Sequence, residues 1–355
     1  MSTHSSGRPG GHLSALLSGG AVVLAGLAAL TATADAPPVT GALQVEVTPV
    51  PLDPGDPSRT QVGPMRFMGG LWLRAEDPRF GGLSDLRVSA DGERLVAVSD
   101  CGNGLTARLS YDAAGRLAGL GEPQLVALTS STGSALAADD VDAESLVAAP
   151  GGGLEVGFEG RGRIEEYGVG FAGPARPLGA PAGLAECARN GGIELMADAG
   201  DGKRLVVCEE RRTASLAVPA WVGRGESWEE RAYPLRFDGG WAGEPFRPTA
   251  AARLPNGDLL VVERRFPPLA ARIVLLEREA LAGHGPLEPR EIARLEPPLT
   301  LDNFEGLEVR RDSEGRTLVY LLSDDNNCVK TGGVARRGVQ RTLLLLFVLE
   351  GEAAL

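Results

Sequence analysis

The sequence is poor in histidine, and this scarcity excludes much familiar hydrolase chemistry. Only three histidines occur among 355 residues, and His284 is the only one beyond residue 12. A lone histidine in the Gly-rich loop 282–286 argues against a Ser-His-Asp triad. The sequence also has no G-x-S-x-G, R-H-G, H-E-x-x-H or P-loop motif. A hydrolase built from this chain therefore needs a carboxylate base or a metal ion.

Long hydrophobic runs are also absent after the first 30 residues. Residues 13–30 form the one apolar run near membrane-spanning length. Small residues follow, and Ala32 and Ala34 fit an A-x-A cleavage site. We therefore predict a signal peptide over residues 1–34, with an uncleaved signal anchor as the alternative. The mature protein is expected to be periplasmic or secreted, without a membrane partner after cleavage.

Positive charge is in deficit as well. The chain has 35 Lys and Arg against 47 Asp and Glu, a net charge of −12. Cleavage after Ala34 removes Arg8 and no acid, so the mature charge is 34 − 47 = −13. An acidic surface repels nucleic acid and anionic lipid, which leaves a cation as the natural small partner. We expect a monomer that does not bind nucleic acid.

What the sequence has in abundance is turns between short apolar runs. It contains 49 Gly and 25 Pro, and helical patterns are scarce. Five segments repeat one pattern, in which a polar start, usually an acid, leads into an apolar strand, a Gly-containing turn and a second apolar strand. Asn-Gly and Asp-Gly turns between such strands are strong hairpin signals. The segments begin near residues 82, 142, 192, 248 and 303.

Repeated hairpins of this kind predict an all-β fold, a β-propeller of five to six blades with mostly four antiparallel strands each. The propeller domain should span residues 67–350, after an N-terminal strand and loop at 35–66. Residues 342–349 need a partner to complete the last blade, and either 43–50 or 67–73 would serve. Such a pairing closes the ring and leaves no exposed edge. A sixth blade built from the two N-terminal strands is the alternative.

In a propeller blade, the start of the innermost strand and the end of the next strand lie at one face. The repeat therefore places two sets of acids around one mouth of the channel. Like charges in such a ring need compensation. A bound cation supplies it in one reading, and Arg or backbone N–H partners supply it in the structural alternative. The acids are Asp85, Glu144, Glu194 and Glu305, with Asp100, Glu159, Glu209, Glu263 and Asp324.

A ring of oxygen donors almost without His or Cys suits Ca²⁺ or Mg²⁺ rather than zinc. We expect Ca²⁺ as the cofactor. The predicted metal ligands are Asp85, Glu144, Glu194, Glu305, Asp324 and Asn326.

The four cysteines have no C-x-x-C spacing, so a zinc site is not indicated, and an even number in an exported chain suggests disulfides. Cys187 precedes the third repeat and Cys208 ends its second strand, so both approach one face. Cys101 and Cys328 end the second strands of the first and last repeats, which are neighbours in a closed ring. These positions predict the pairs Cys187–Cys208 and Cys101–Cys328.

The motifs GGLSDLRVSADGERLVAVSD, NGGIELMADAGDGKRLVVCEE, LPNGDLLVVERRF and DNFEGLEV with LLSDDNN resemble the exported bacterial phytase-like family, described as "esterase-like activity of phytase". The resemblance covers about residues 67–350. It implies a propeller, export, and hydrolysis of phosphoesters or related esters. One departure is visible at residues 247–250, where the family's opening acid is missing and Thr249-Ala250 stands instead.

The resemblance also implies roles for individual residues. Glu159, Glu263 and Arg264 fall on the family's pattern and are the expected catalytic residues. Arg161, Arg163 and Arg265 follow the same strand ends and are expected to bind a small anionic substrate, because Arg holds phosphate well. A non-catalytic binding propeller with a structural cation, and a lactonase or carboxylesterase, remain the alternatives.

Overall fold

The computed structural model describes residues 43–188, 191–210, 215–238, 243–327 and 340–351. All of them belong to one compact unit that begins at Ala42. The predicted signal peptide at residues 1–34 lies outside the described residues. Within the described part of the chain, no helix is long and apolar enough to cross a membrane.

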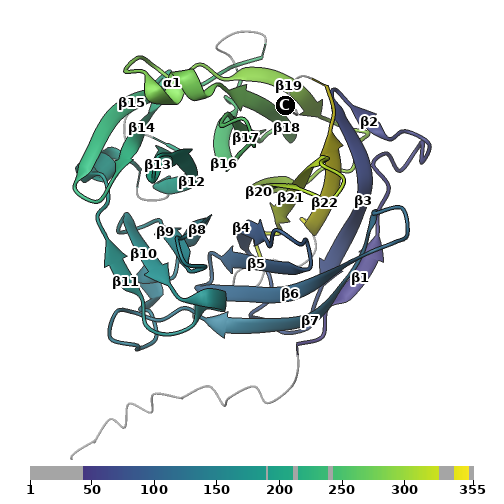
Figure 1. Cartoon of the computed structure of the whole chain (residues 1–355), viewed down its shortest axis with the longest axis horizontal. Helices are drawn as coiled ribbons and strands as arrows, with labels where there is room; N and C mark the ends of the chain where they lie inside the picture. Colours follow the sequence, from purple (N-terminus) through teal and green to yellow (C-terminus); the bar gives the residue numbers. More distant parts are fainter. Residues whose placement is uncertain (1–42, 189–190, 211–214, 239–242, 328–339, 352–355) are drawn as a thin grey trace, which may run out of the picture. The chain divides into compact units, whose positions relative to one another are not determined.

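The described residues form five antiparallel sheets arranged in a ring, which confirms the predicted β-propeller (Figure 1). Four of the sheets are blades of four consecutive strands, ordered from the centre of the ring outward. Blade 1 contains β4 (Leu83–Val88), β5 (Arg94–Ser99), β6 (Asn103–Tyr111) and β7 (Leu117–Ala127). Blade 2 contains β8 (Ala143–Ala148), β9 (Leu154–Phe158), β10 (Arg163–Tyr167) and β11 (Arg176–Leu178).

Blades 3 and 4 repeat this arrangement, and four short helices lie in loops. Blade 3 contains β12 (Ile193–Gly200), β13 (Lys203–Cys208), β14 (Ala217–Arg224) and β15 (Ser227–Pro234). Blade 4 contains β16 (Arg247–Arg253), β17 (Leu259–Arg265), β18 (Ala270–Leu276) and β19 (Arg290–Leu295). The helices are η1 (Ala138–Asp140), η2 (Val169–Phe171), η3 (Ala182–Glu186) and α1 (Arg278–Ala282).

Blade 5 joins the two ends of the domain. Its strands β20 (Asn303–Arg311), β21 (Thr317–Asp324) and β22 (Thr342–Leu349) come last in the chain, and β22 pairs with β3 (Met65–Arg74). Two further N-terminal strands, β1 (Glu46–Pro49) and β2 (Gln61–Val62), pair with β3. The predicted ring closure is therefore confirmed, with β3 in the closing position. The alternative of a sixth blade is wrong, because the N-terminal strands extend blade 5.

The hydrophobic core lies between neighbouring blades. One cluster joins Val262 of blade 4 to Phe304 and Phe347 of blade 5, and a second joins Leu322 of blade 5 to Leu86 of blade 1. Because both faces of a blade are covered, its central strands read as continuous apolar runs. Every residue of β22, with sequence TLLLLFVL, is buried.

Candidate functional site

Each of the five innermost strands carries a β-bulge near its first residue. One residue of each strand is skipped in the pairing with the second strand. A bulge re-aims the side chain of the extra residue. The skipped residues are Ser84, Glu144, Glu194, Thr249 and Glu305.

A second set of five equivalent positions lies at the end of each second strand. These positions directly follow the residue that pairs just before the bulge. Four are acids, and blade 4 has an arginine instead. They are Asp100, Glu159, Glu209, Arg264 and Asp324. We call the seven carboxylates of both sets, together with Arg264, the acidic mouth.

The carboxylates of the acidic mouth repel one another strongly. Burial, followed by repulsion from Glu194 and Asp100, raises the pKa of Glu144 well above its usual range. Burial and the neighbouring Glu209 do the same to the pKa of Glu194. The pKa values of Glu305 and Asp324 rise for the same reasons, burial first. The acidic mouth therefore favours protons or cations.

Arg264 supplies a positive charge on one side of the acidic mouth. Its Nη2 donates a hydrogen bond to Oε1 of Glu209 at 3.0 Å, and lies 3.3 Å from Oε1 of Glu305. Oε1 of Glu194 is 3.9 Å away. The buried Nε of Arg264 has no hydrogen-bond partner within the described residues. Arg264 therefore holds three carboxylates and keeps one donor uncommitted.

The opposite side of the acidic mouth gathers carboxylates with oxygens close enough to share an ion. Asp142, Glu144 and Glu159 each offer one carboxylate oxygen, and these oxygens lie within 4.8 Å of one another. Oε1 of Glu159 also accepts a hydrogen bond of 2.7 Å from the backbone N–H of Gly192, which fixes its orientation. A set of oxygen donors at this spacing fits a hard divalent cation. We call Asp142, Glu144 and Glu159 the carboxylate trio.

Asp142 is the member of the carboxylate trio that sequence reasoning missed. It lies two residues before Glu144, directly ahead of β8. Side chains two residues apart in an extended chain point to the same side, and this spacing was the available signal.

Asp85, a predicted metal ligand, is not at a bulge position. Ser84 takes that place, and Asp85 accepts hydrogen bonds from the backbone N–H groups of Leu146 at 2.8 Å and Leu307 at 3.4 Å. These bonds connect β4 to the innermost strands of the two neighbouring blades. Burial raises the pKa of Asp85 to about 6, although Arg87 and the backbone donors oppose the rise. Asp85 is therefore placed to brace the inner strands.

Glu263, a predicted catalytic residue, also lies away from the mouth. It pairs with Pro248 one position before Arg264, so its side chain points to the other face of β17. It is fully buried, where Tyr233 donates its hydroxyl at 2.6 Å and Arg272 donates from Nε. Glu263 is therefore enclosed by these partners and is not exposed at the acidic mouth, and its catalytic role stays a prediction.

Two of the three predicted substrate-binding arginines meet at Asp140, where Arg161 binds the carboxylate and Arg163 donates to the backbone carbonyl at 2.7 Å, while Arg265 lies apart from them. Arg161 pairs with Asp140 and is 71% exposed. Arg163 pairs with Glu165 and lies over the ring of Phe158. Arg265 donates to Asp238 at 2.6 Å.

The predicted ligand Asn326 is exposed, and its side-chain amide donates to Gln340 at 2.9 Å. Its backbone N–H donates to Asp324, so Asn326 reaches the acidic mouth through the main chain.

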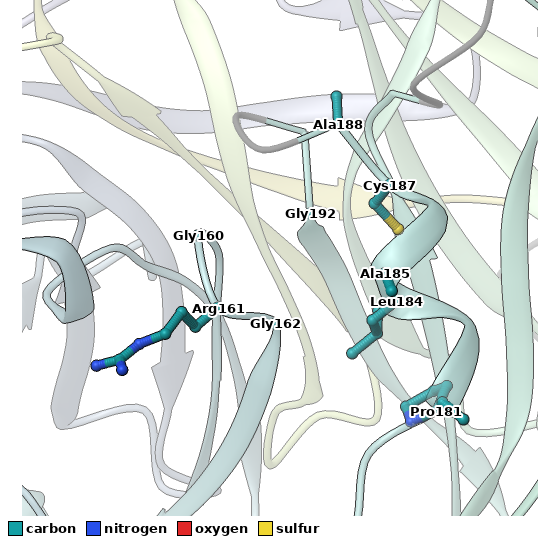
Figure 2. A pocket seen from close by; sticks show the side chains of 10 residues that line it. Gly160, Arg161, Gly162, Pro181, Leu184, Ala185, Cys187, Ala188 and Gly192 are labelled. Carbon is teal, nitrogen blue, oxygen red and sulfur yellow. The ribbon is translucent and has the colours of Figure 1, made fainter.

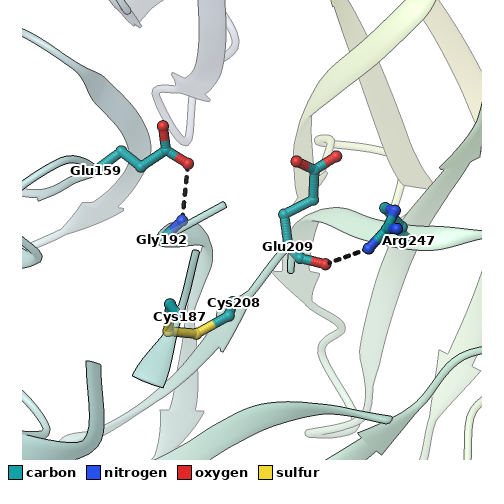
Figure 3. The surroundings of a disulfide bond; sticks show 6 residues. All are labelled: Glu159, Cys187, Gly192, Cys208, Glu209 and Arg247. Atoms are coloured by element: carbon teal, nitrogen blue, oxygen red, sulfur yellow. Dashed lines mark hydrogen bonds between the residues drawn. A yellow bond between two sulfur atoms is a disulfide. The ribbon is translucent and has the colours of Figure 1, made fainter. Parts of the chain in front are cut away.

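The disulfide Cys187–Cys208 is present, as predicted, with Cα atoms 6.0 Å apart (Figure 3). It links the end of β13 to the residue after η3, beside the Glu159–Gly192 hydrogen bond. Cys328, the predicted partner of Cys101, lies outside the described residues, so that pair stays a prediction.

Fold and site together define a five-bladed β-propeller with an acidic mouth. A sequence profile of the phytase-like family, described as esterase-like activity of phytase, matches residues 78–327. The chain belongs to this family. A search of curated protein sequences finds no match.

Solved structures resemble the chain only distantly. The PQQ-bound aldose sugar dehydrogenase from Streptomyces coelicolor is 13% identical, with a TM-score of 0.40 over 86% of this chain and 98% of that one. A gluconolactonase from Xanthomonas campestris is 11% identical, with a TM-score of 0.40 over 79% of each chain. An endo-arabinase from Bacteroides thetaiotaomicron is 12% identical, with a TM-score of 0.43 over 75% of this chain and 93% of that one. Similarities this low say nothing about what this chain binds or converts.

Proposed function

We propose that this protein is a metal-assisted ester hydrolase whose active site is the acidic mouth. The carboxylate trio carries the proposal, because its three oxygen donors lie within 4.8 Å of one another. The family's description as esterase-like is in keeping with it. The chemistry must come from carboxylates and a cation, because His284 is exposed and paired with Glu229.

Ca²⁺ is the proposed cofactor. The trio offers only carboxylate oxygens, which hard cations prefer, and Ca²⁺ tolerates irregular sets of six to eight oxygen ligands. When bound, a divalent cation polarises a carbonyl or phosphoryl oxygen as a Lewis acid. Asp142, Glu144 and Glu159 would hold it, with Glu159 oriented by the Gly192 N–H.

Glu194 is the proposed general base. It stands between the trio and Arg264, since it interacts electrostatically with both Glu159 and Arg264. Burial and the neighbouring Glu209 raise its pKa, which makes its carboxylate a stronger base than a solvated one. Arg264 lies 3.9 Å from its Oε1 and opposes that rise, so Arg264 positions and tunes this base.

A neutral carboxylic ester or lactone is the proposed substrate class. The sequence suggested a phosphate held by several arginines, but Arg161, Arg163 and Arg265 pair with carboxylates of their own. The acidic mouth then keeps Arg264 as its one arginine among the described residues, and a polyanion would meet seven carboxylates. A small phosphomonoester is the second candidate, because Arg264 supplies one positive charge at the acidic mouth.

We also propose that the protein is exported to the periplasm or beyond and acts as a monomer. The Cys187–Cys208 disulfide supports an oxidising compartment.

The test uses the chain without residues 1–34, freed of metal and then given Ca²⁺, Mg²⁺ or EDTA. Thermal unfolding and hydrolysis of 4-nitrophenyl acetate, a lactone and 4-nitrophenyl phosphate are measured together. A ligand that binds only the folded state at one hundred times its Kd stabilises it by about 2.7 kcal/mol. Calcium-dependent stabilisation with calcium-dependent ester turnover is the expected result. Stabilisation without any turnover would indicate a binding propeller. If calcium neither stabilises the protein nor supports turnover, the metal-site proposal is overturned.

A further inference from the structure

A pocket of about 430 Å³ lies beside the acidic mouth, between blade 2 and the helix η3 (Figure 2). One wall is the turn Gly160–Gly162, which connects β9 to β10. The other wall comes from η3 and the residues after it, including Leu184, Ala185 and Cys187. Pockets of this volume are typical of small-molecule sites.

The walls of this pocket contrast with the acidic mouth. None of the described residues that line it carries a carboxylate, and most are Gly, Ala, Pro and Leu. Leu184 points toward Gly162, where an added Cβ would lie 3.2 Å from it. Arg161 contributes its backbone side, because its guanidinium turns away from η3 and pairs with Asp140. The pocket therefore offers small aliphatic side chains together with exposed backbone groups, and no carboxylate among its described lining residues.

The pocket adjoins the carboxylate trio through Glu159. Gly160 follows Glu159 in the chain, and Gly192, on the facing wall, donates its N–H to Oε1 of Glu159. A Cβ on Gly192 would lie 2.9 Å from Cγ of Glu159, so only glycine allows the wall to approach this closely. A molecule in the pocket would therefore have its polar end near the trio.

The disulfide fixes the η3 wall. Cys187 lines the pocket and is bonded to Cys208 at the end of β13. Beneath η3, an added Cβ on Gly183 would lie 2.7 Å from the buried ring of Trp221. The wall is thus anchored to blade 3 from two directions, and the pocket is preformed.

We propose that this pocket is the subsite for the apolar group of the ester substrate. The inference rests on the proposed ester hydrolysis, and it specifies the substrate class as esters with a compact apolar substituent. The reacting ester bond lies toward Glu159, and the apolar group lies along η3 beside Leu184 and Ala185. Transfer of each buried methylene from water is favourable, which gives binding that a polyanionic substrate would lack.

Ala185→Phe is the test variant, because Ala185 is an exposed residue that lines the pocket, and the larger side chain would fill it. The matched control is Ala114→Phe, in the exposed turn between β6 and β7. Thermal unfolding should be unchanged in both. We expect Ala185→Phe to lower kcat/KM for 4-nitrophenyl butyrate about tenfold or more, while methyl acetate changes less than about twofold. Equal effects on the two esters would overturn the subsite.

A binding measurement keeps the subsite testable on its own. The neutral fluorescent probe N-phenyl-1-naphthylamine should bind the wild type and Ala114→Phe, and Ala185→Phe should weaken its binding about tenfold. If no ester is hydrolysed but this difference remains, the proposed function fails and the apolar site stands. If esters are hydrolysed but the probe binds all three proteins equally, the site fails and the proposed function stands.

Discussion

The blade 2 side and the blade 4 side of the acidic mouth use the same backbone positions for opposite purposes. In blade 2 the bulge and strand-end positions hold Glu144 and Glu159. In blade 4 they hold Thr249 and Arg264. Arg264 opposes the rise in the pKa values of Glu194, Glu305 and Asp324. The main influences on Glu144, in contrast, all raise its pKa.

This difference shows that the same strand-end position can hold either a positively charged side chain or a carboxylate that requires a bound cation or a proton. The Arg264 side is compensated by the chain itself. The blade 2 side has no arginine of its own in the acidic mouth, as far as the chain is described, so it depends on a proton or a bound ion. Thr249 adds no carboxylate to the Arg264 side. Its hydroxyl donates a hydrogen bond to the carbonyl of Phe304 at 2.9 Å and carries no charge.

The largest expected effect comes from neutralising the blade 2 side. Glu144→Gln and Glu159→Gln each remove one charged ligand, while the amide oxygen introduced by Glu159→Gln can still accept the Gly192 N–H. We expect a loss of about 100-fold or more in kcat/KM and of the calcium-dependent rise in Tm, comparable to the removal of one electrostatic catalytic group. Asp324→Asn, on the Arg264 side, is the comparison variant. An equal loss of the calcium response in Asp324→Asn would break the distinction between the two sides.

Arg264→Met should have the next largest effect, because it leaves Glu209, Glu305 and Glu194 without their shared partner. Breaking a buried ion pair from one side costs about 3–5 kcal/mol, and the partial exposure of Arg264 lowers the expectation to about 2–3 kcal/mol. Added Ca²⁺ should restore part of this loss, since the Arg264 side would then resemble the blade 2 side. Urea unfolding with and without Ca²⁺ measures both quantities. Arg253→Met, at an arginine 40% exposed, is the control, and a similar loss there would contradict the prediction.

Glu308 allows the effect of burial on a carboxyl pKa to be measured apart from the repulsion within the acidic mouth. It lies outside the mouth and has an arginine partner of its own. Its Oε2 is 3.3 Å from Nη1 of Arg87, yet burial raises its pKa to about 8. The folded state therefore keeps a proton that the unfolded state loses at about pH 4.3, so this contribution to stability is present at low pH and disappears as pH rises toward 8.

Glu308→Gln should flatten this dependence of the free energy of unfolding between pH 5 and 8, since each pKa unit of difference between the folded and unfolded states corresponds to about 1.4 kcal/mol. Urea titrations across that range provide the measurement. An unchanged slope would mean that burial alone does not perturb carboxylates in this channel.

The smallest effect is expected for Arg161→Ala. Arg161 is exposed and its guanidinium pairs with Asp140, away from the pocket and the trio. Exposed ion pairs contribute little, so kcat/KM for 4-nitrophenyl acetate and 4-nitrophenyl phosphate should change less than about twofold. A tenfold loss for the phosphate alone would restore the phosphate clamp that the sequence suggested.

The repeat made the propeller predictable, whereas the bulges hid part of the site. Apolar runs separated by Gly turns repeat along the sequence, and this repeat is visible without any knowledge of tertiary contacts. Strand pairs and ring closure could therefore be predicted from it. A bulge shifts the side-chain alternation by one residue, and no composition signal marks it. Asp85 therefore looked equivalent to Glu144, although Ser84 holds that position.

The same one-residue ambiguity affected blade 4. Glu263 and Arg264 are adjacent, and both were predicted to act at the mouth. Alternation along β17 sends Glu263 to Arg272 and Tyr233, and Arg264 to the acidic mouth. Sequence placed the two residues at the correct strand end, but only the pairing register with Pro248 and Arg247 decides which faces the channel.

The closure of blade 5 has a consequence for the order in which the protein assembles. Blades 1 to 4 are made of consecutive strands, so their contacts are local in sequence and cheap in loop entropy. The β3–β22 pairing instead joins the two ends of the described domain. During synthesis β3 emerges long before Thr342–Leu349, the strand with which it pairs, and must wait for it. We infer that β3 spends this interval as an exposed edge open to wrong partners, and that its meeting with β22 is the late step of folding.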